Sequence, residues 1–373
     1  MRVAVTGAYG FLGWHTRARH HALHGVDALP LGRDDFADVD GLVTALRNID
    51  VVVHIAGVNR AASDALLEHG NVVIARMLAQ AMRIADVSLH VVNANSIQSL
   101  RDTPYGRGKR KAGEILAQAA AATHSSFADV YLPNLFGEHG RPHYNSFVAT
   151  FCSNAVEGRE STVTDDREIP LLHAQAAADV LLTAAFRHED HQVWPPGERH
   201  LISEVHDTIQ GFHATYSRGQ IPALPDRFAL DLFNTYRSYL FPQAFPFGVE
   251  VSSDARGDLF EAVRVHGSTG QVFASTTMPG MTRGEHFHLS KIERFFVVSG
   301  TAMISLRKVL DDEVVRFQVK GEDRAYVDMP TLWVHNITNV GDDELVMLSW
   351  ADQPLDPAAP DTYRERVVPG GAA

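Results

Sequence analysis

Three side chains in the first third of the chain have the types and spacing of a proton-transfer site. Tyr105 and Lys109 lie four residues apart, so on a helix both side chains share one face. The ammonium can lower the pKa of the phenol, which could then protonate a developing alkoxide or remove a hydroxyl proton. Ser96 follows a strand-like run, where its hydroxyl could bind a substrate oxygen. Tyrosine and lysine at this spacing also occur on solvated helix faces, but the ordered set of three indicates a catalytic site.

A glycine-rich turn near the start of the chain is typical of a dinucleotide site. It stands between a strand-like run and a helical stretch. Glycines there permit a sharp bend and a close approach of the backbone to a pyrophosphate, and the helix N-terminus offers free N–H groups. A turn without a ligand is the alternative. The residues of this turn expected to contact the cofactor are Gly7, Gly10, Phe11, Leu12 and Gly13.

The end of the predicted second strand bears on the choice of cofactor. An arginine at this place would receive a ribose 2′-phosphate, whereas an acidic residue would accept the 2′-hydroxyl. Arg33 therefore favours NADP(H). The adjacent Asp34 could turn inward instead, which would favour NAD(H).

The C-terminal third carries a set of metal-ligand side chains. His286 and His288 are two residues apart, so on a strand they point to the same side, and Glu293 could return from the next strand. His335 would supply the fourth ligand. Three imidazoles and a carboxylate suit zinc or another divalent transition metal. A His-x-His pair alone would mean little among 20 histidines, but the full set predicts a metal site, with a purely structural ion as the alternative.

Length and composition narrow the class of protein. The 373 residues are enough for two domains, and 45% hydrophobic with 21% charged residues is typical of a globular chain. A formal net charge of −12 disfavours nucleic acid and anionic membrane surfaces as partners. The single cysteine, Cys152, excludes an internal disulfide and a cysteine-based zinc site. No leader or membrane-spanning stretch is visible, so we expect a cytoplasmic protein without membrane insertion.

From residue 1 to about 200, short β-branched runs alternate with Ala-rich helical stretches, which is the pattern of βαβ units. We therefore predict that residues 1–245 form an NAD(P)-binding α/β domain with a Rossmann-type, doubly wound parallel sheet. Strands are expected at 2–5, 51–55 and 90–93, and helices at 66–84 and 110–122.

The Pro- and Phe-rich segment 241–248 cannot continue a helix and marks the predicted domain boundary. Residues 246–373 would then form an all-β, jelly-roll domain. The tail after Pro354, rich in Pro and Ala, is expected to be a loosely held terminus. The expected C-terminal strands are 272–278, 295–298, 302–306, 325–328 and 345–350.

Residues 1 to about 240 resemble the extended short-chain dehydrogenase/reductase family. The resemblance is carried by the glycine turn, Ser96 and the Tyr105-x-x-x-Lys109 pair. It implies a nucleotide-sugar substrate and a lysine that also holds the nicotinamide ribose of the cofactor.

Further stretches of the same resemblance imply additional contacts. The run from His54 to Gly57 is similar to the family's cofactor-lining strand, so Ala56 and Gly57 are expected at the cofactor. Residues 133–137 are similar to its substrate-contacting segment, which makes Asn134 a substrate-binding candidate. Tyr131 stands where relatives often carry arginine, a departure that affects the expected substrate contacts.

The metal-ligand residues lie in two stretches, 280–300 and 330–339, that resemble the signature motifs of the cupin superfamily. The resemblance implies a cupin barrel. Leu332 occupies the usual place of a glycine, which would weaken the loop geometry but not the ligand set. Residues 254–261 resemble the opening strand of cupin-type deoxysugar epimerases.

A reductase followed by a cupin resembles, over the whole chain, a family of bifunctional capsular-polysaccharide biosynthesis enzymes. That family takes a UDP-linked 4-keto-6-deoxy-N-acetylhexosamine: the cupin inverts C3, and the reductase delivers hydride from NADPH to the C4 ketone. The product is UDP-N-acetyl-6-deoxy-L-talosamine, on the route to N-acetyl-L-fucosamine of capsule or O-antigen polysaccharide. Asn145, in a matching stretch, is a further substrate-binding candidate, and a homodimer is expected. No residue can be chosen as the C3 base.

Two alternatives stay open. The chain could be a simple NAD(P)-dependent nucleotide-sugar reductase or epimerase whose cupin is a structural, dimerising or regulatory metal module. It could also be a redox-state sensor without turnover, although the intact Tyr-x-x-x-Lys argues against a sensor.

Overall fold

Six strands of the N-terminal half pair in parallel, which confirms the predicted class of sheet. The computed structural model describes residues 1–254, 257–260, 262–267, 270–353 and 356–369. Strands β2 and β3 lie on opposite sides of β1, and open α/β sheets bind ligands at the carboxyl ends of strands where the order reverses in this way. In spatial order the strands are β2 (Leu29–Leu31), β1 (Val3–Thr6), β3 (Val51–His54), β4 (His90–Ser96), β5 (Ser126–Leu132) and β8 (His191–Val193).

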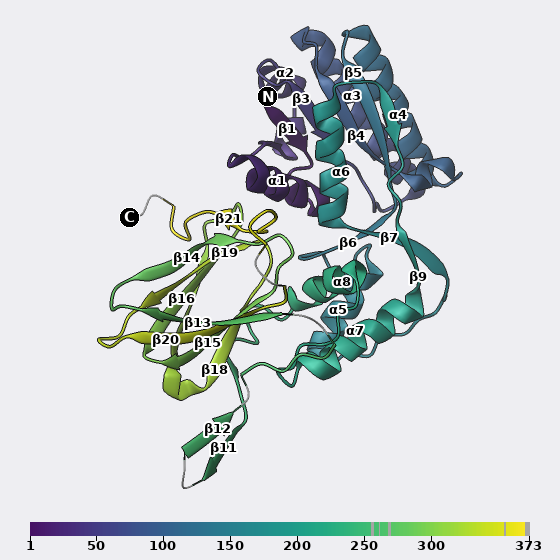
Figure 1. The fold of residues 1–373 in the computed structure, drawn as a ribbon. Helices are drawn as coiled ribbons and strands as arrows, with labels where there is room; N and C mark the ends of the chain where they lie inside the picture. The colour runs from purple at the N-terminus through teal and green to yellow at the C-terminus, as the bar shows by residue number, and fades with distance from the viewer. Residues whose placement is uncertain (255–256, 261, 268–269, 354–355, 370–373) are drawn as a thin grey trace. The chain divides into compact units, whose positions relative to one another are not determined.

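Helices cover both faces of this sheet, as a doubly wound fold requires (Figure 1). Ala4 and Val52 point to one face and pack with α2, α3 and α4, whereas Val5 and Val53 point to the other and pack with α1 and α6. The expected helices at 66–84 and 110–122 are thus confirmed as parts of α3 and α4. The helices are α1 (Phe11–His24), α2 (Val39–Leu46), α3 (Asp64–Ala85), α4 (Pro104–Ala122) and α6 (Ala174–Arg187).

A smaller sheet and three further helices occupy the middle of the chain. The sheet joins β6 (Asn134–Phe136), β7 (Glu168–His173) and β9 (Glu198–Leu201). The helices are α5 (Phe147–Glu157), α7 (Ile202–Tyr216) and α8 (Arg227–Arg237). Among the described residues, no helix combines the length and the apolar character that crossing a bilayer demands.

Two five-stranded antiparallel sheets form the C-terminal part, so the predicted all-β character is confirmed. Phe295 and Val327 from one sheet pack with Ile304 and Ile337 from the other in a shared core. One sheet contains β10 (Phe247–Gly248), β18 (Ala325–Met329), β15 (Glu293–Ser299), β20 (Leu345–Ala351) and β13 (Gln271–Thr277). The other contains β17 (Val314–Lys320), β16 (Thr301–Lys308), β19 (Trp333–Asn339), β14 (Thr282–Phe287) and β21 (Tyr363–Arg364).

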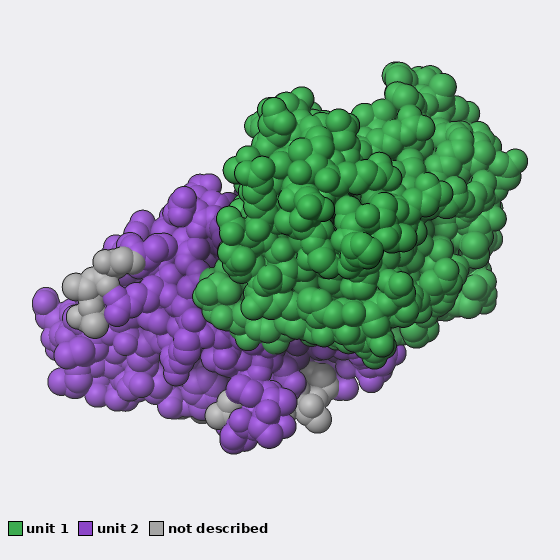
Figure 2. Space-filling model, turned by 90° about the horizontal axis from the view of Figure 1, so that it is seen from above, with its two compact units in different colours: residues 1–147, 165–202 green, residues 148–164, 203–373 purple. Residues whose placement is uncertain are grey.

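The chain divides into two units that do not follow chain order (Figure 2). Unit 1 comprises Met1–Phe147 and Asp165–Ile202, and unit 2 comprises Val148–Thr164 and Ser203–Ala373. Unit 2 therefore holds α8 and nearly all of α5 and α7 together with the C-terminal strands. The predicted boundary between a domain of residues 1–245 and a domain of residues 246–373 stays a prediction, because these compact units are not continuous stretches of the chain.

A buried charge cluster explains why α7 and α8 pack with these strands. The guanidinium of Arg294, fully buried, donates to both carboxylate oxygens of Asp328 at 2.7 and 3.0 Å. Tyr216 of α7 also donates its hydroxyl hydrogen to Asp328. Arg237 of α8 donates to the Met329 carbonyl at 2.9 Å. The helices are thus cross-linked to β15 and β18 by groups that would be costly to leave unpaired.

The expectation of a loosely held tail is wrong for residues 360–367. β21 pairs with β14, and Val367 is completely buried. Composition misled here because the Pro- and Ala-rich stretch precedes the residues that make these contacts. The resemblance at 254–261 falls on a segment of which residues 255, 256 and 261 lie outside the described residues, and it stays a prediction.

Candidate functional site

The glycine turn of unit 1 has the shape of a phosphate cradle. Gly7 adopts φ +66°, and a Cβ there would lie 2.9 Å from the backbone of Ala56. A Cβ on Gly13 would lie 2.1 Å from the Gly7 carbonyl oxygen. Side chains are therefore excluded from both positions by the protein's own backbone, which lets the turn pack closely against β3 and α1.

Helix α1 presents its N-terminus from this turn. Gly10 is the N-cap and donates to the Gly7 carbonyl at 2.9 Å, and Phe11 and Leu12 are the first helical residues. The first turn of α1 carries no acidic side chain. Its free N–H groups and partial positive charge fit a pyrophosphate.

Thr6, which sequence reasoning did not single out, joins the ends of β1 and β3. Its hydroxyl oxygen accepts hydrogen bonds from the N–H groups of Ile55 and Ala56, both at 3.1 Å, and lies 2.9 Å from Nδ1 of His54. Burial, with a smaller contribution from Lys109, lowers the pKa of His54 to about 3, so this imidazole is neutral. Ala56 is thereby held beside the glycine turn.

Gly57 is fixed by a second unpredicted residue, Asn71 of α3. The Asn71 amide accepts from the Val58 N–H at 3.1 Å and donates to the Val58 carbonyl at 2.7 Å. A Cβ on Gly57 would lie 2.9 Å from the Asn71 amide oxygen. No signal in the sequence distinguishes Asn71 from the other polar residues of its helix.

Arg33 follows the carboxyl end of β2 and is exposed, as a side chain that binds a cofactor phosphate must be. Asp34 is exposed as well. Asp35 is engaged with the backbone, since its carboxylate accepts from the Gly32 N–H at 2.7 Å. Arg33 and Asp34, the two side chains expected to bear on the choice of cofactor, are thus both accessible.

Ser96 and Tyr105 are brought together by the end of β4 and the start of α4. Thr103 caps α4 by accepting from the Gly106 N–H at 3.1 Å, which places Tyr105 in the first turn. Burial raises the pKa of Tyr105, and a hydrogen bond between its side chain and that of Ser96 acts in the opposite direction. The predicted lowering of this pKa by Lys109 is not found here.

Lys109 is directed elsewhere. Its ammonium is buried and donates to the Ala94 carbonyl at 2.7 Å. Burial lowers the pKa of Lys109 to about 8, and the carboxylate of Asp129 opposes the shift. The lysine is therefore tied to β4, one helical turn after the tyrosine.

Asp129 organises a buried polar cluster on β4 and β5. Its two carboxylate oxygens accept from the amide nitrogens of Asn93 at 2.8 Å and Asn95 at 3.0 Å. The Asn95 amide oxygen in turn accepts from the Ser96 N–H at 2.8 Å, and the Tyr131 side chain is hydrogen-bonded to Asp129. The carboxylate of Asp129 inside a strand-like run is the one signal for this cluster in the sequence, and it was not among the predicted site residues.

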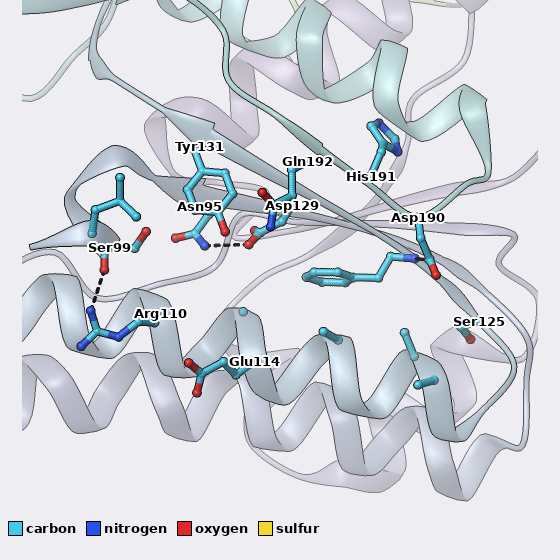
Figure 3. A pocket seen from close by; sticks show the side chains of 16 residues that line it. Asn95, Ser99, Arg110, Glu114, Ser125, Asp129, Tyr131, Asp190, His191 and Gln192 are labelled. Carbon is cyan, nitrogen blue, oxygen red and sulfur yellow. Dashed lines mark hydrogen bonds between the residues drawn. The ribbon is translucent and has the colours of Figure 1, made fainter.

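A pocket of about 560 Å³ adjoins this cluster between α4 and the strands β5 and β8 (Figure 3). Asn95, Asp129 and Tyr131 lie together at one part of its wall, facing Arg110 and Glu114 of α4. The Tyr131 ring also stacks on Trp194 with centroids 3.7 Å apart. The residue that replaces the relatives' arginine thus belongs to this wall.

The two predicted substrate residues lie in different places. Asn134 begins β6 and donates to the Pro170 carbonyl at 3.3 Å. Asn145 is exposed and donates to the Asn59 carbonyl at 3.0 Å, in the segment that follows β3. Asn145 is therefore tied to the loop that begins with the expected cofactor contacts.

In unit 2 the four predicted metal ligands converge. Their candidate ligand atoms all lie within 4.8 Å of one another. Nε2 atoms of three imidazoles surround one carboxylate oxygen of Glu293, at 3.9 Å for His286, 3.0 Å for His288 and 3.4 Å for His335. The residues come from β14, the loop after it, β15 and β19.

The donor set fits a divalent cation. A carbonyl oxygen can only accept, so Nδ1 of His288, 2.5 Å from the Asp361 carbonyl, and Nδ1 of His335, 3.1 Å from the Trp333 carbonyl, must carry hydrogens. In a neutral ring Nε2 then has a lone pair, which here faces the carboxylate of Glu293. Burial lowers the pKa of His335 to about 4, so this ring is neutral near pH 7. A metal ion would relieve the repulsion between these electron pairs.

Glu293 is ionised in this cluster. Burial acts to raise its pKa, but where the surrounding imidazoles carry a hydrogen on Nε2, their hydrogen bonds lower that pKa well below its usual range. Where the rings are neutral with the hydrogen on Nδ1, a bound cation would stabilise the carboxylate instead. Leu332 adopts φ +66°, the conformation that favours glycine, and its N–H donates to the His288 carbonyl at 2.8 Å. The loop geometry expected to weaken is kept, because Leu332 is completely buried and its burial offsets a strain of about 1–2 kcal/mol.

Comparison with known proteins covers both units. Residues 3–194 match the NAD dependent epimerase/dehydratase family, and residues 252–363 match the polysaccharide biosynthesis C-terminal domain. The chain is 31% identical over 367 residues to UDP-2-acetamido-2,6-beta-L-arabino-hexul-4-ose reductase of Pseudomonas aeruginosa, covering 97% of this chain and 98% of that protein.

Solved structures agree with these matches. The crystal structure of the capsular polysaccharide assembling protein CapF from Staphylococcus aureus is similar with a TM-score of 0.64 and 30% identity, covering 98% of this chain and all of that chain. The crystal structure of UDP-glucose 4-epimerase from Thermotoga maritima is similar with a TM-score of 0.52 and 14% identity. The match covers 57% of this chain and 83% of that chain, and it shows that the matched parts share a fold.

Proposed function

Because the chain belongs to the CapF-type members of the NAD-dependent epimerase/dehydratase family, we propose that it is a two-step enzyme acting on a UDP-linked 4-keto-6-deoxy-N-acetylhexosamine. The cupin domain first inverts C3. The reductase domain then reduces the C4 ketone with NADPH and yields UDP-N-acetyl-6-deoxy-L-talosamine, on the route to N-acetyl-L-fucosamine of capsule or O-antigen polysaccharide.

In the reductive step, NADPH supplies a hydride to C4 when it is bound. Tyr105 donates its phenolic proton to the C4 oxygen, and Ser96 holds that oxygen through its hydroxyl. Ser96 is itself held by Asn95, whose amide accepts from its N–H. Lys109, whose ammonium donates to the Ala94 carbonyl in this structure, would hold the nicotinamide ribose when the cofactor is bound.

The cofactor is bound by the turn and loops described above. The α1 N-terminus receives the pyrophosphate at Gly7, Gly10, Phe11, Leu12 and Gly13. Ala56 and Gly57 line the nicotinamide side, and Arg33 pairs with the 2′-phosphate. Asn134 and Asn145 contact the substrate.

In the epimerising step, a proton leaves C3 beside the C4 ketone and returns to the opposite face. A divalent metal ion, most simply zinc, held by His286, His288, Glu293 and His335, would act as a Lewis acid toward the ketone and stabilise the negative charge that forms when the proton leaves. The two domains would then act in turn on the same ketone.

One observation carries this proposal. The chain matches, over 97% of its length, a protein named as the reductase of a UDP-linked hexul-4-ose. The hydroxyls that reduction needs, those of Ser96 and Tyr105, are hydrogen-bonded to each other, which fits that match. The net charge of −12 disfavours nucleic-acid partners. We further propose that the enzyme is cytoplasmic and a homodimer.

The test separates the two steps. The protein is incubated with the UDP-4-keto sugar in deuterated water, first without and then with NADPH, and the sugar is analysed by NMR and mass spectrometry. We expect deuterium at C3 without NADPH, and a C4 alcohol only when NADPH is added. Reduction without any C3 exchange would show a simple reductase whose cupin is a structural, dimerising or regulatory module. If the protein neither exchanges C3 nor reduces C4 of this sugar, the proposed enzymatic function is wrong.

A further inference from the structure

The C-terminal strap, residues 360–367, pairs alongside β14, the strand that carries the candidate metal ligand His286. Tyr363 pairs with Phe287, and Arg364 pairs with His286, in the ladder between β21 and β14. The Tyr363 ring stacks on that of Phe287 with centroids 5.4 Å apart. The strap therefore pairs with β14 up to its last residue, Phe287, which directly precedes His288.

Asp361 of the strap fixes the loop between two ligands. Its carboxylate accepts hydrogen bonds from the N–H groups of Leu289 at 3.0 Å, Ser290 at 2.9 Å and Lys291 at 2.8 Å. The Ser290 hydroxyl donates to it as well, at 2.9 Å. One side chain thus satisfies three consecutive backbone donors in the turn that follows His288 and precedes Glu293.

The backbone of Asp361 contacts a ligand directly. Its carbonyl oxygen lies 2.5 Å from Nδ1 of His288, so the imidazole donates there and keeps Nε2 for the candidate metal site. Asp361 adopts φ +41°, a left-handed conformation that a non-glycine residue keeps only when its surroundings hold it.

Those surroundings are anchors on both sides of Asp361. The buried Lys291 ammonium donates to the Pro360 carbonyl at 2.6 Å and to the Thr362 hydroxyl at 3.4 Å. Further along, the carbonyl and N–H of Val367 bind Arg307 and Glu285, each at 2.7 Å. The strap is held at both ends and bears on His288 in between.

We propose that Asp361 is a positioning residue for the metal site, and that the C-terminal strap fixes the ring orientation and tautomer of His288. This role rests on the metal site of the proposed function. Partners that bind the second nitrogen of a ligating histidine raise metal affinity about 10- to 100-fold in proteins generally. The strap supplies that partner from a position 73 residues further along the chain.

The test measures metal binding by the full chain rather than activity. Wild type, Asp361→Ala, Asp361→Asn and Asp356→Ala are stripped of metal and titrated with Zn²⁺ in competition with a chromophoric chelator. Co²⁺ is titrated in parallel, because its visible spectrum reports the number and geometry of its ligands. Asp356→Ala is the matched control: Asp356 lies in the same tail, is exposed, and accepts from the Ala358 N–H at 2.9 Å.

We expect one Zn²⁺ per wild-type chain and no change in Asp356→Ala. Asp361→Ala keeps the backbone carbonyl that faces His288 but loses the carboxylate that fixes this carbonyl to the loop, so we expect a Kd raised by about 10-fold, and at most about 100-fold, with an altered Co²⁺ spectrum. Asp361→Asn keeps the side-chain volume and one acceptor oxygen, so it should lose less, and it decides the matter if the alanine variant does not fold. Wild-type affinity and spectrum in a folded Asp361 variant would overturn the positioning role alone. A wild-type chain that binds no metal would overturn the metal site and this role together.

Discussion

The two candidate sites are assembled by different means. In unit 1, the residues proposed for reduction lie at the carboxyl ends of parallel strands or in the first turns of helices, so the fold itself brings Gly7, Ser96 and Tyr105 to one edge of the sheet. In unit 2, three candidate metal ligands lie on paired strands, and the fourth, His288, lies in a loop that the distant Asp361 holds. Topology positions the whole of the first site, whereas the second also needs a cross-link from the C-terminal strap.

This difference has a consequence for substitutions. A change in unit 1 should remove one chemical step and leave the sheet intact, because backbone pairing carries the geometry. A change among the cross-links of unit 2 should disturb metal binding as well as stability, because the loop that carries His288 is held by such a cross-link and not by strand pairing.

The largest effect is expected from His288→Ala, which removes one of the four ligands. It should abolish stoichiometric metal binding and C3 exchange, while the NADPH affinity of unit 1 stays at its wild-type value. Metal analysis, deuterium exchange at C3 and NADPH titration measure the three properties on protein shown by circular dichroism to be folded. If metal is lost and exchange persists, the ion is structural and the metal-assisted step is wrong.

Tyr105→Phe tests the other side of the comparison. Reduction of the keto sugar should fall by about 10²- to 10⁴-fold, because the phenol is the proton donor of that step. C3 exchange in the same sample serves as the internal control and should be unchanged. NADPH oxidation near the wild-type rate would remove Tyr105 from the proposed role.

Asp328→Asn tests how far the stability of unit 2 depends on its buried cross-links. The substitution leaves the fully buried Arg294 without its carboxylate, and breaking such a pair costs about 3–5 kcal/mol of unfolding free energy. Glu322→Gln, which breaks an exposed pair with Lys320 in the same unit, is the control and should cost at most about 1 kcal/mol. Denaturant unfolding followed by near-UV circular dichroism measures both, and equal losses would contradict the distinction.

Sequence patterns predicted the parallel sheet and the β-rich C-terminal part, because strand–turn–helix signals are local. They also picked out the four residues that converge in unit 2, although only His286 of the expected strand pair lies on β14 and His288 lies in the loop after it. The residues that support these groups left weaker signals. Asp129 and Asp328 are carboxylates inside apolar strands, and their partners are set by pairings that no local pattern reveals. Asp361 lies in a tail whose composition predicts a loose end, and only the fold brings it to His288.

The smallest expected effect concerns cofactor choice, which the topology of unit 1 leaves to exposed side chains. If Arg33 binds the 2′-phosphate, Arg33→Ala should lower the ratio of kcat/KM for NADPH to that for NADH by about tenfold or more, since hydrogen bonds to charged groups contribute about 1.5–3 kcal/mol. Arg47→Ala, another exposed arginine of unit 1, should leave the ratio unchanged. An enzyme that prefers NADH from the start would instead assign the ribose to Asp34. Neither result would change the roles proposed for Gly7 and Tyr105, because the ends of the strands fix the position of the site. The side chains of Arg33 and Asp34 would only select which cofactor binds there.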